Sequence, residues 1–501
     1  MAHHRDRWAS RPAFIMAAIG SAIGLGNLWR FPMVTYANGG GAFLIPYIVA
    51  LLTAGVPLMI LEYALGQRFQ KSSPGSLHEA GGKPFEIIGW WALGIGATIS
   101  FYYAVLMGWS WDYLVFSFTQ PWASAGTGTC DVAQSFFDHM LNKSGTVTQI
   151  GGVSWPAIAG LVVTWAAIYW IIKKGVLRVG KVVMLTVPLP FIILLLILIR
   201  GVTLPGAMEG LRYYLTPDFA KLIDAKTWLA AYGQVFFSLS LGFGLLTAYA
   251  SYLPKRSDVS NNAFITSFAD AGFAYFAGFS VFSVLGYLAQ CHGVPVSEVV
   301  QGGPSLTFVV YPTAISMMPL APVIAALFFI ALLTLGIDSA FSIVEGVVAG
   351  VRDKWNLSQE KASAGFCIFG LLVGLLFTTG AGYYWLDIVD RWMNEYGLAV
   401  IGFMECVAIG WFYGTKKLRD YINEVSDFRI GWWWDLFVKW ITPLAIGWAI
   451  VTSVINDFKE PYGAGDYPTW ALMLGGWGVI AAIIIVAAIL TRIPWLEKGE
   501  K

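Results

Sequence analysis

The sequence predicts an all-α protein that crosses a membrane many times. Of its 501 residues, 57% are hydrophobic and only 12% are charged, which is far from the balance of a soluble domain. Apolar runs long enough to cross about 30 Å of hydrocarbon, at about 1.5 Å per helical residue, recur along the whole chain. We therefore interpret the chain as a polytopic helical membrane protein.

Twelve apolar runs are long enough to be membrane spans. Loops that are separated from the N-terminus by an even number of spans lie on the same side of the membrane as the N-terminus. Most of the 31 Lys and Arg residues fall in the N-terminal segment, in these loops or after the last span. An excess of basic residues marks the cytoplasmic side, so we expect both termini in the cytoplasm, with no cleaved signal peptide before the first span. The spans are expected at residues 12–36, 41–69, 87–118, 154–172, 181–200, 227–252, 262–290, 322–351, 361–380, 383–413, 432–456 and 468–491.

The first run is broken in its middle. Residues 21–32 read SAIGLGNLWRFP, which places Gly24, Gly26, Pro32 and the charged Arg30 inside a membrane-spanning segment. In hydrocarbon every backbone N–H and C=O group must be satisfied, so unwound backbone persists only where it is buried in protein or lines a site. The pattern predicts a discontinuous helix whose half-helix ends point at a ligand.

The sixth run carries a second break. Residues 236–244 read FFSLSLGFG and again combine hydroxyl side chains with two glycines, Gly242 and Gly244. Helix packing also uses small residues, but glycines separated by one residue lie on different faces of a helix, so packing explains them poorly. Broken spans at corresponding positions of two halves indicate an inverted-repeat transporter with its site at the repeat interface.

Nine acidic residues lie in or at the ends of the apolar runs, where each costs about 2.5–3.5 kcal/mol on insertion scales. Few basic residues lie at the same depth, so cations or protons are expected to supply the missing charge. Asp338 and Ser339 lie in mid-span, and carboxylate, hydroxyl and carbonyl oxygens together suit a hard cation such as sodium. The nine acids are Glu62, Asp112, Asp270, Asp338, Glu345, Asp387, Asp390, Glu405 and Asp435; Asp112, Asp387 and Asp435 could instead mark helix ends.

The four cysteines carry little information about function. Cys367 and Cys406 lie in spans, where a cysteine usually serves as a small buried hydrophobe. Cys130 and Cys291 lie in or beside outer loops, and the sequence leaves open whether they form a disulfide.

Taken together, the two breaks, the LGIDS segment at 335–339 and the N-terminal RDRW at 5–8 resemble the neurotransmitter:sodium symporter family. The likeness extends over nearly the whole chain and is greatest to the bacterial amino-acid transporter branch that includes the leucine transporter. It implies a five-plus-five inverted repeat, with helices 1 and 6 broken and two extra helices, and sodium-driven uptake by alternating access. The expected parts are a cytoplasmic segment at 1–11, repeats at 12–200 and 227–413, an extracellular loop at 201–226, and helices 11–12 with the C-terminus at 414–501.

The resemblance implies two sodium sites. The first would be formed by the Ala22 carbonyl, Asn27, Ser238 and Asp270, with the substrate carboxylate completing the shell. The second would be formed by the carbonyls of Gly20, Ile23 and Leu335 with Asp338 and Ser339.

The resemblance also implies a substrate pocket at the two breaks. The substrate carboxylate would lie on the amides near Leu25 and Gly26 and on the Tyr103 hydroxyl, as free amides at a helix start suit an anion. Amine-transporting relatives carry an acid where this chain has Gly24, which favours substrates that bring their own carboxylate. The mainly apolar lining favours a small or medium neutral amino acid, with alanine, valine and leucine all open. The expected substrate-binding residues are Ser21, Ala22, Leu25, Gly26, Ile99, Tyr103, Phe237, Ser238, Ser240, Phe243, Ser339 and Ile343, with Ala340 as a further lining residue.

Two pairs of charged residues are implied as gates. Arg30 and Asp390 would pair on the outer side, above a lid formed by Phe237 and Tyr103. On the inner side, Arg5 and Asp353 would pair near Trp8 and Tyr252. Pairs that solvent can reach contribute only about 0–1 kcal/mol, which suits contacts that break in every cycle.

The chain departs from the family pattern beside the first sodium site. Asp270 stands where many members have asparagine, and Ala274 stands where chloride-dependent members have serine. Two sodium ions and the substrate ammonium would balance Asp270, Asp338 and the substrate carboxylate. Burying net charge in a low dielectric is costly, so the balance predicts transport without chloride.

The sequence therefore predicts a sodium symporter for a neutral amino acid, using two sodium ions and no chloride. A facilitator or channel without sodium coupling is the alternative. An enzyme is disfavoured because the five histidines lie in loops or at the N-terminus, without metal-site spacing. The expected partners are the amino acid and the lipid bilayer of a bacterial inner (plasma) membrane, with no nucleic acid and no obligate protein partner.

Overall fold

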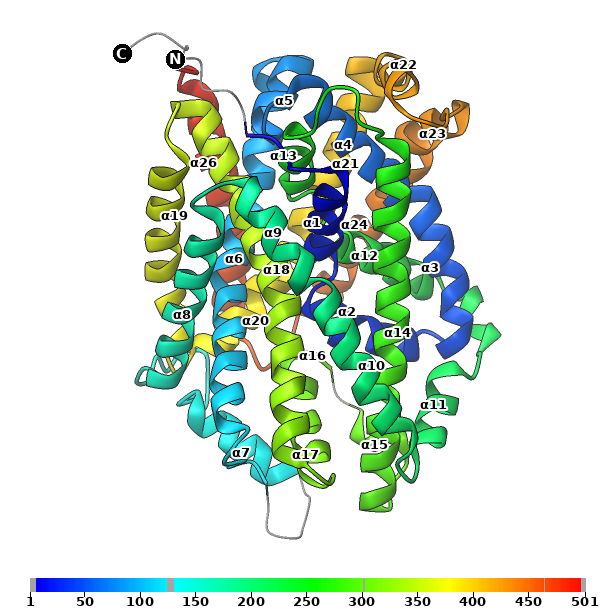
Figure 1. The fold of residues 1–501 in the computed structure, drawn as a ribbon, viewed down its shortest axis with the longest axis vertical. Helices are drawn as coiled ribbons and strands as arrows, with labels where there is room; N and C mark the ends of the chain where they lie inside the picture. Colours follow the sequence, from blue (N-terminus) through cyan, green and yellow to red (C-terminus); the bar gives the residue numbers. More distant parts are fainter. Residues whose placement is uncertain (1–5, 124–129, 301, 464, 497–501) are drawn as a thin grey trace.

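The computed structural model describes residues 6–123, 130–300, 302–463 and 465–496. These residues form a bundle of helices (Figure 1). Within these residues the only β pairing is an antiparallel bridge between Val153 and Thr379. Ten helical segments are long and apolar enough to cross a membrane, and an eleventh candidate is a pair of helices, α1 and α2, bent by 53° at a short break. The all-α polytopic class predicted from the sequence is confirmed.

The helices divide into long membrane-crossing rods and short connecting helices. They are α1 (Arg11–Ala22), α2 (Leu25–Ala37), α3 (Leu44–Ala50), α4 (Val56–Phe69), α5 (Ser73–Gly81), α6 (Lys83–Phe116), α7 (Cys130–Met140), α8 (Trp155–Ile172), α9 (Val176–Thr186), α10 (Pro188–Val202), α11 (Ala207–Leu215), α12 (Ala225–Ser238), α13 (Leu245–Ser251), α14 (Ser260–His292), α15 (Val296–Val299), α16 (Gly303–Ser305), α17 (Tyr311–Ser316), α18 (Ala321–Trp355), α19 (Gln359–Gly374), α20 (Gly382–Trp392), α21 (Ala399–Val407), α22 (Thr415–Val425), α23 (Trp432–Leu436), α24 (Thr442–Lys459), α25 (Thr469–Leu472) and α26 (Val479–Arg492).

The ten unbroken segments overlap ten of the twelve expected runs. The two remaining runs coincide with the α1–α2 pair and with α12 and α13, which are separated by residues 239–244; the total of twelve spans stays a prediction. The largest boundary difference is at the expected end at 413, where helix continues to Val425. Hydropathy misses α22 because this helix is mostly polar and buries only one narrow face, which includes Leu418 and Ile422.

Local sequence explains the first break. Helix α1 begins after Ser10, whose hydroxyl accepts the Ala13 N–H, and it ends at the extended residue Ile23. Helix α2 begins after Gly24, whose own N–H donates to the Asn27 side-chain oxygen at 2.9 Å. The side chain of Asn27 therefore satisfies an amide at the break that no helical carbonyl reaches.

The second break depends on left-handed backbone. Ser240, Gly242 and Gly244 have φ values of 54°, 78° and 70° between the end of α12 and the start of α13. Glycine adopts such angles without a steric penalty. Serine at φ 54° is uncommon, and its hydroxyl is anchored by donating to the Ser21 carbonyl at 2.9 Å. The second break thus supplies a hydrogen-bond donor to a carbonyl at the first break.

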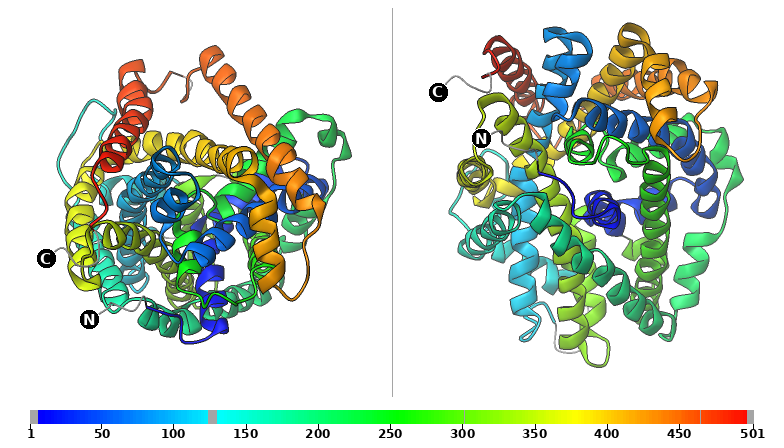
Figure 2. Two further views of the ribbon diagram at one scale, coloured as in Figure 1. Left: turned by 90° about the horizontal axis from the view of Figure 1, so that it is seen from above. Right: turned by 45° about the horizontal axis from the view of Figure 1, so that its top comes forward.

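The broken helices lie inside the bundle. Figure 2 (right) shows α1 almost end-on near the middle of the bundle. The long helices α6 and α18 pack along each other, and α1 contacts α9, α14 and α18. At one end of the molecule a single hollow is lined by both Asp6 and Leu496, so the two ends of the described chain lie on the same side.

Candidate functional site

A cavity of about 350 Å³ lies between the two breaks, α6 and α18. All of the predicted substrate-binding residues line it, from Ser21 to Ile343. Ala340 is buried but is not among the lining residues. The volume is at the lower end of the range for small-molecule sites.

Backbone and hydroxyl groups converge at the base of this cavity. The Leu25 N–H, in the first turn of α2, donates to the Tyr103 hydroxyl at 3.4 Å. A Cβ atom at Gly24 would lie 2.8 Å from the Ser339 hydroxyl and 3.3 Å from the Tyr103 hydroxyl. A Cβ atom at Gly26 would lie 2.2 Å from the Phe237 ring. Glycine at these positions therefore keeps the polar base open and lets an aromatic ring close over the break.

The first predicted sodium site forms one hydrogen-bonded cluster. Asp270 accepts hydrogen bonds from the Asn27 amide at 2.8 Å and from the Ser238 hydroxyl at 2.7 Å. The same Asn27 amide nitrogen also donates to Ser238 at 3.2 Å. All three side chains are buried, and Ala22 lines the adjoining cavity. The structure brings these residues together, with the amide nitrogen of Asn27 facing the carboxylate.

The second predicted sodium site also comes together. The Ser339 hydroxyl lies 3.4–3.5 Å from the carbonyl oxygens of Gly20, Ser21 and Ile23. A Cβ atom at Gly20 would lie 3.0 Å from the Asp338 carboxylate, so the absence of a side chain lets this carboxylate approach α1. Leu335 lies about one turn before Asp338 on α18 and is buried. The result is a buried group of oxygen atoms of the kind that a hard cation prefers.

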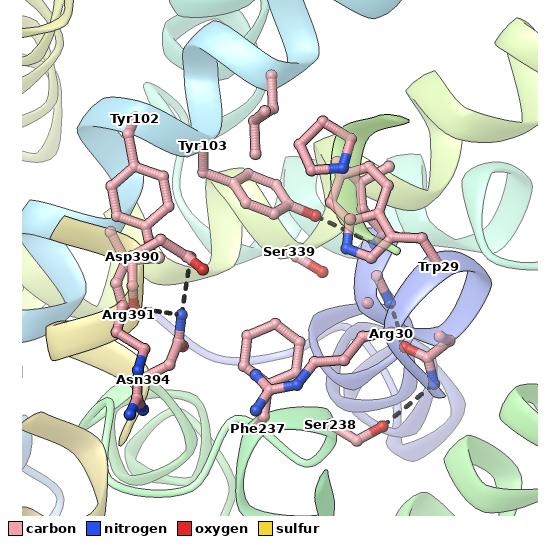
Figure 3. Close-up of a pocket in the computed structure, with 18 of the residues that line it drawn as sticks. Trp29, Arg30, Tyr102, Tyr103, Phe237, Ser238, Ser339, Asp390, Arg391 and Asn394 are labelled. Carbon is pink, nitrogen blue, oxygen red and sulfur yellow. Dashed lines mark hydrogen bonds between the residues drawn. The ribbon is translucent and has the colours of Figure 1, made fainter. Parts of the chain in front are cut away.

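The predicted outer gate residues line the cavity but do not touch each other. Among the described residues, no ion pair joins Arg30 to Asp390. Instead, the Arg30 guanidinium lies 4.5 Å from the centre of the Phe237 ring, and Asp390 accepts from the Asn394 amide at 2.7 Å (Figure 3). The expected pairing stays a prediction for another conformation.

Of the predicted inner gate, Arg5 lies outside the described residues. Asp353 accepts the Ser72 N–H at 2.7 Å. The Trp8 indole donates to the Tyr249 carbonyl at 2.9 Å, and the Trp8 N–H donates to the Tyr252 carbonyl at 3.3 Å. Trp8 is buried, so the N-terminal segment is tied to the residues that follow the second break.

Sequence reasoning missed several residues that the structure places at these sites. The Thr186 hydroxyl donates to Oδ1 of Asp338 at 2.6 Å, and a hydroxyl in an apolar run shortly before a proline was the available signal. Near the predicted outer gate, Arg391, Asn394 and Tyr462 also line the cavity. These three residues follow both breaks in the sequence, and no pattern of glycines or of intramembrane acids marks them as site residues.

Comparison with known proteins defines the class as sodium-coupled symporters. The Sodium:neurotransmitter symporter family matches residues 5–498. An uncharacterized sodium-dependent transporter of Methanocaldococcus jannaschii is 39% identical over 98% of this chain and 99% of its own length. The sodium-dependent dopamine transporter of Bos taurus is 34% identical over 97% of this chain and 74% of its own length. The chain belongs to the sodium:neurotransmitter symporter family, and it is a multi-pass membrane protein.

Thr186→Val tests the second cation site. The change removes the hydroxyl that donates to Asp338 and keeps the shape of the side chain. Hydrogen bonds to charged groups contribute roughly 1.5–3 kcal/mol, so the sodium concentration for half-maximal transport should rise about tenfold or more. Thr186→Ser keeps the hydroxyl and is the matched control, which should stay near the unmodified protein. Equal sodium dependence of all three proteins would show that Thr186 does not support a sodium ligand.

Proposed function

We propose that this symporter imports a small or medium neutral amino acid together with two sodium ions, by alternating access. One observation carries the proposal: a small cavity joins amide and hydroxyl donors at the start of α2 to two buried carboxylate clusters. Donors of this kind suit a carboxylate, and the carboxylate clusters suit cations.

The chemistry of the cavity wall favours a substrate that carries its own carboxylate. The acids that line the cavity are Asp387, Asp390 and Glu395, which lie on α20 and the turn after it, not beside Gly24. Dopamine, named for the bovine relative, is an amine without a carboxylate. At Gly24 this chain offers open space between two hydroxyl groups in place of an acid. An amino-acid carboxylate on Leu25, Gly26 and Tyr103 fits that space.

In this proposal the ammonium group meets the carbonyls of Ala22, Phe237, Ser238 and Ser240. The apolar part of the substrate contacts Ile99, Phe243 and Ile343, which line the cavity. Because one methylene changes preference by only about 1–3 kcal/mol, such a pocket accepts related neutral side chains. Uptake of several of them, in graded order, is therefore the expected behaviour.

The first sodium ion is proposed to bind at Ala22, Asn27, Ser238 and Asp270, next to the substrate carboxylate. Its binding requires the Asn27 amide to rotate, because the nitrogen now faces Asp270 and the oxygen accepts the Gly24 N–H. The second sodium ion is proposed at Gly20, Ile23, Leu335, Asp338 and Ser339. Both ions would thus be linked to the broken first span, and one of them also to the substrate.

The proposed cycle alternates between an outer and an inner opening. Here the cavity reaches outward to Arg391 and Tyr462, while Trp8 is buried against the residues after the second break. Closure outside would bring Arg30 to Asp390, and opening inside would release Trp8 and the Arg5–Asp353 pair. We place both termini in the cytoplasm of a bacterial cell, which agrees with the common position of Asp6 and Leu496.

Uptake by proteoliposomes tests the amino-acid proposal against a sodium-independent facilitator. Two sodium ions with a zwitterion move two charges, worth about 4.6 kcal/mol at roughly 100 mV, enough to concentrate a substrate on the order of a thousandfold. Labelled alanine, valine or leucine should accumulate with an inward sodium gradient and more so with a negative interior. Uptake that stops at equal concentrations regardless of sodium would exclude symport of that amino acid, and uptake of dopamine alone would exclude the substrate class.

Chloride independence is proposed from charge balance at the first sodium site. Asp270 is fully buried beside Asn27 and Ser238. Ala274, about one turn further along α14, is also buried and offers only a methyl group. The fixed carboxylate of Asp270 balances the charge of one bound cation. Without this carboxylate, an exchangeable anion such as chloride would have to supply the negative charge.

Replacing chloride by gluconate should therefore leave uptake unchanged. The double variant Asp270→Asn with Ala274→Ser removes the charge and adds a hydroxyl on the same helix face; its uptake should be low in gluconate and recover in part when chloride is added. Asp270→Asn alone is the matched control and should be weak in both media. Chloride-dependent uptake by the unmodified protein, or full activity of Asp270→Asn in gluconate, would contradict the charge balance.

A further inference from the structure

The turn between α8 and α9 concentrates positive charge. Residues 169–186 contain four basic side chains and no acidic one. Within the described part of the chain none of the four forms an ion pair, whereas Lys71 and Arg352, which line the same hollow as the turn, pair with Glu79 and Asp6. The charge of the turn is therefore not balanced by the protein itself. We call these four residues the basic turn: Lys173, Lys174, Arg178 and Lys181.

Two of the four cations are held over aromatic rings. The Lys173 ammonium lies 5.2 Å from the centre of the Tyr169 ring, and the Arg178 guanidinium lies 4.8 Å from the centre of the Trp170 ring. Arg178 also donates to the Trp170 carbonyl at 2.7 Å. A guanidinium carries five N–H donors, so this one bond fixes Arg178 and leaves donors for an anion. Trp170 is 54% exposed, as is typical of an indole at a membrane interface.

Helix α9, which follows the turn, has one face on the protein and one face outward. Its inward face is buried and includes Gly180, where a Cβ atom would lie 3.2 Å from the Ala13 side chain of α1. On the outward face Leu177, Lys181 and Leu185 follow one another at successive helical turns, and all three are exposed. Figure 2 (left) shows the segment from α9 to α10 at the rim of the bundle. In a membrane, α9 thus lies between α1 and the lipid.

The mixture of charged and apolar groups on this surface determines what it can bind. Basic side chains at the membrane end of a helix attract the negative charges of phospholipid headgroups. Lys181 lies one turn deeper than Leu177, and a long lysine side chain can extend from that depth to the headgroup region. A free phosphate ion would meet the same charges but would leave Leu177 and Leu185 unused, whereas acyl chains would cover them.

We propose that the basic turn binds the headgroup of an acidic phospholipid, whose acyl chains lie along Leu177 and Leu185. Arg178 contacts the phosphate with the donors that the Trp170 carbonyl leaves, and the three lysines surround the headgroup. The site lies at the end of the molecule that holds both ends of the described chain, because Lys174 lines the same hollow as Asp6 and Leu496.

The bound lipid stabilises the position of α9. This helix packs against α1 on its inward face, and Thr186 at its end donates to Asp338 of α18. A headgroup held by the basic turn therefore restrains the element that connects the lipid surface to the first break.

Lipid titration of the purified full-length protein, read by native mass spectrometry, tests the proposal. The protein should bind dioleoyl-phosphatidylglycerol more tightly than dioleoyl-phosphatidylcholine, which has the same acyl chains and no net charge. Each basic residue near an anionic lipid contributes about fivefold. The double variant Lys174→Gln with Lys181→Gln should therefore bind phosphatidylglycerol roughly 25-fold more weakly. Both lysines are exposed, so the change removes charge without removing buried contacts.

Two control variants separate this site from a general effect of charge. Lys174→Arg with Lys181→Arg keeps both charges and should keep the preference for the acidic lipid. Lys361→Gln with Lys416→Gln removes two other exposed charges and should leave it unchanged. Equal phosphatidylglycerol affinity of the unmodified protein and the Lys174/Lys181 glutamine variant would overturn the proposal. Displacement of the lipid by millimolar inorganic phosphate at constant ionic strength would also overturn it, since the occupant would then be a soluble anion.

Hydrogen exchange in nanodiscs tests the effect on α9 without a transport assay. The backbone amides of α9 should exchange more slowly in phosphatidylglycerol than in phosphatidylcholine, with α14 as the internal reference. The difference should disappear in the Lys174/Lys181 glutamine variant. Identical exchange of α9 in the two lipids would contradict its stabilisation by the headgroup, whatever substrate the protein transports.

Discussion

The rest of the structure depends on one constraint, which is that unwound backbone inside a membrane must find partners within the protein. At the first break those partners are the side chains of Asn27, Ser240 and Ser339. They come from three different elements, α2, the second break and α18. The second break therefore helps to satisfy the first, which α18 also supports through Ser339.

The same partners make the site polar where the surrounding helices are apolar. A hydroxyl that satisfies a carbonyl can also face a cation, and an amide at the start of a helix can receive an anion. Asp270 and Asp338 add fixed charge on α14 and α18, within reach of the first break. The proposed substrate and ion sites thus share the broken span, which is the physical requirement for coupling their movements.

Much of this arrangement was predictable from the sequence, because glycine pairs and intramembrane acids stand out against apolar runs. The two breaks are of this kind, whereas the grouping of Asn27, Ser238 and Asp270 was implied by the family resemblance. The contact of Thr186 with Asp338 depends on how helices rotate and pack. Hydropathy carries no information on rotation, and it also misses α22, whose narrow apolar face is outweighed by its charges.

The central claim is that the broken first span makes one shared site for sodium and a carboxylate. Binding of radioactive sodium to the purified protein, with and without a saturating neutral amino acid, tests it most directly because linked sites must affect each other equally. The account predicts that the amino acid raises sodium affinity and that the matching amine, which lacks the carboxylate, does not. Sodium affinity that is the same with the amino acid, the amine and neither would contradict it.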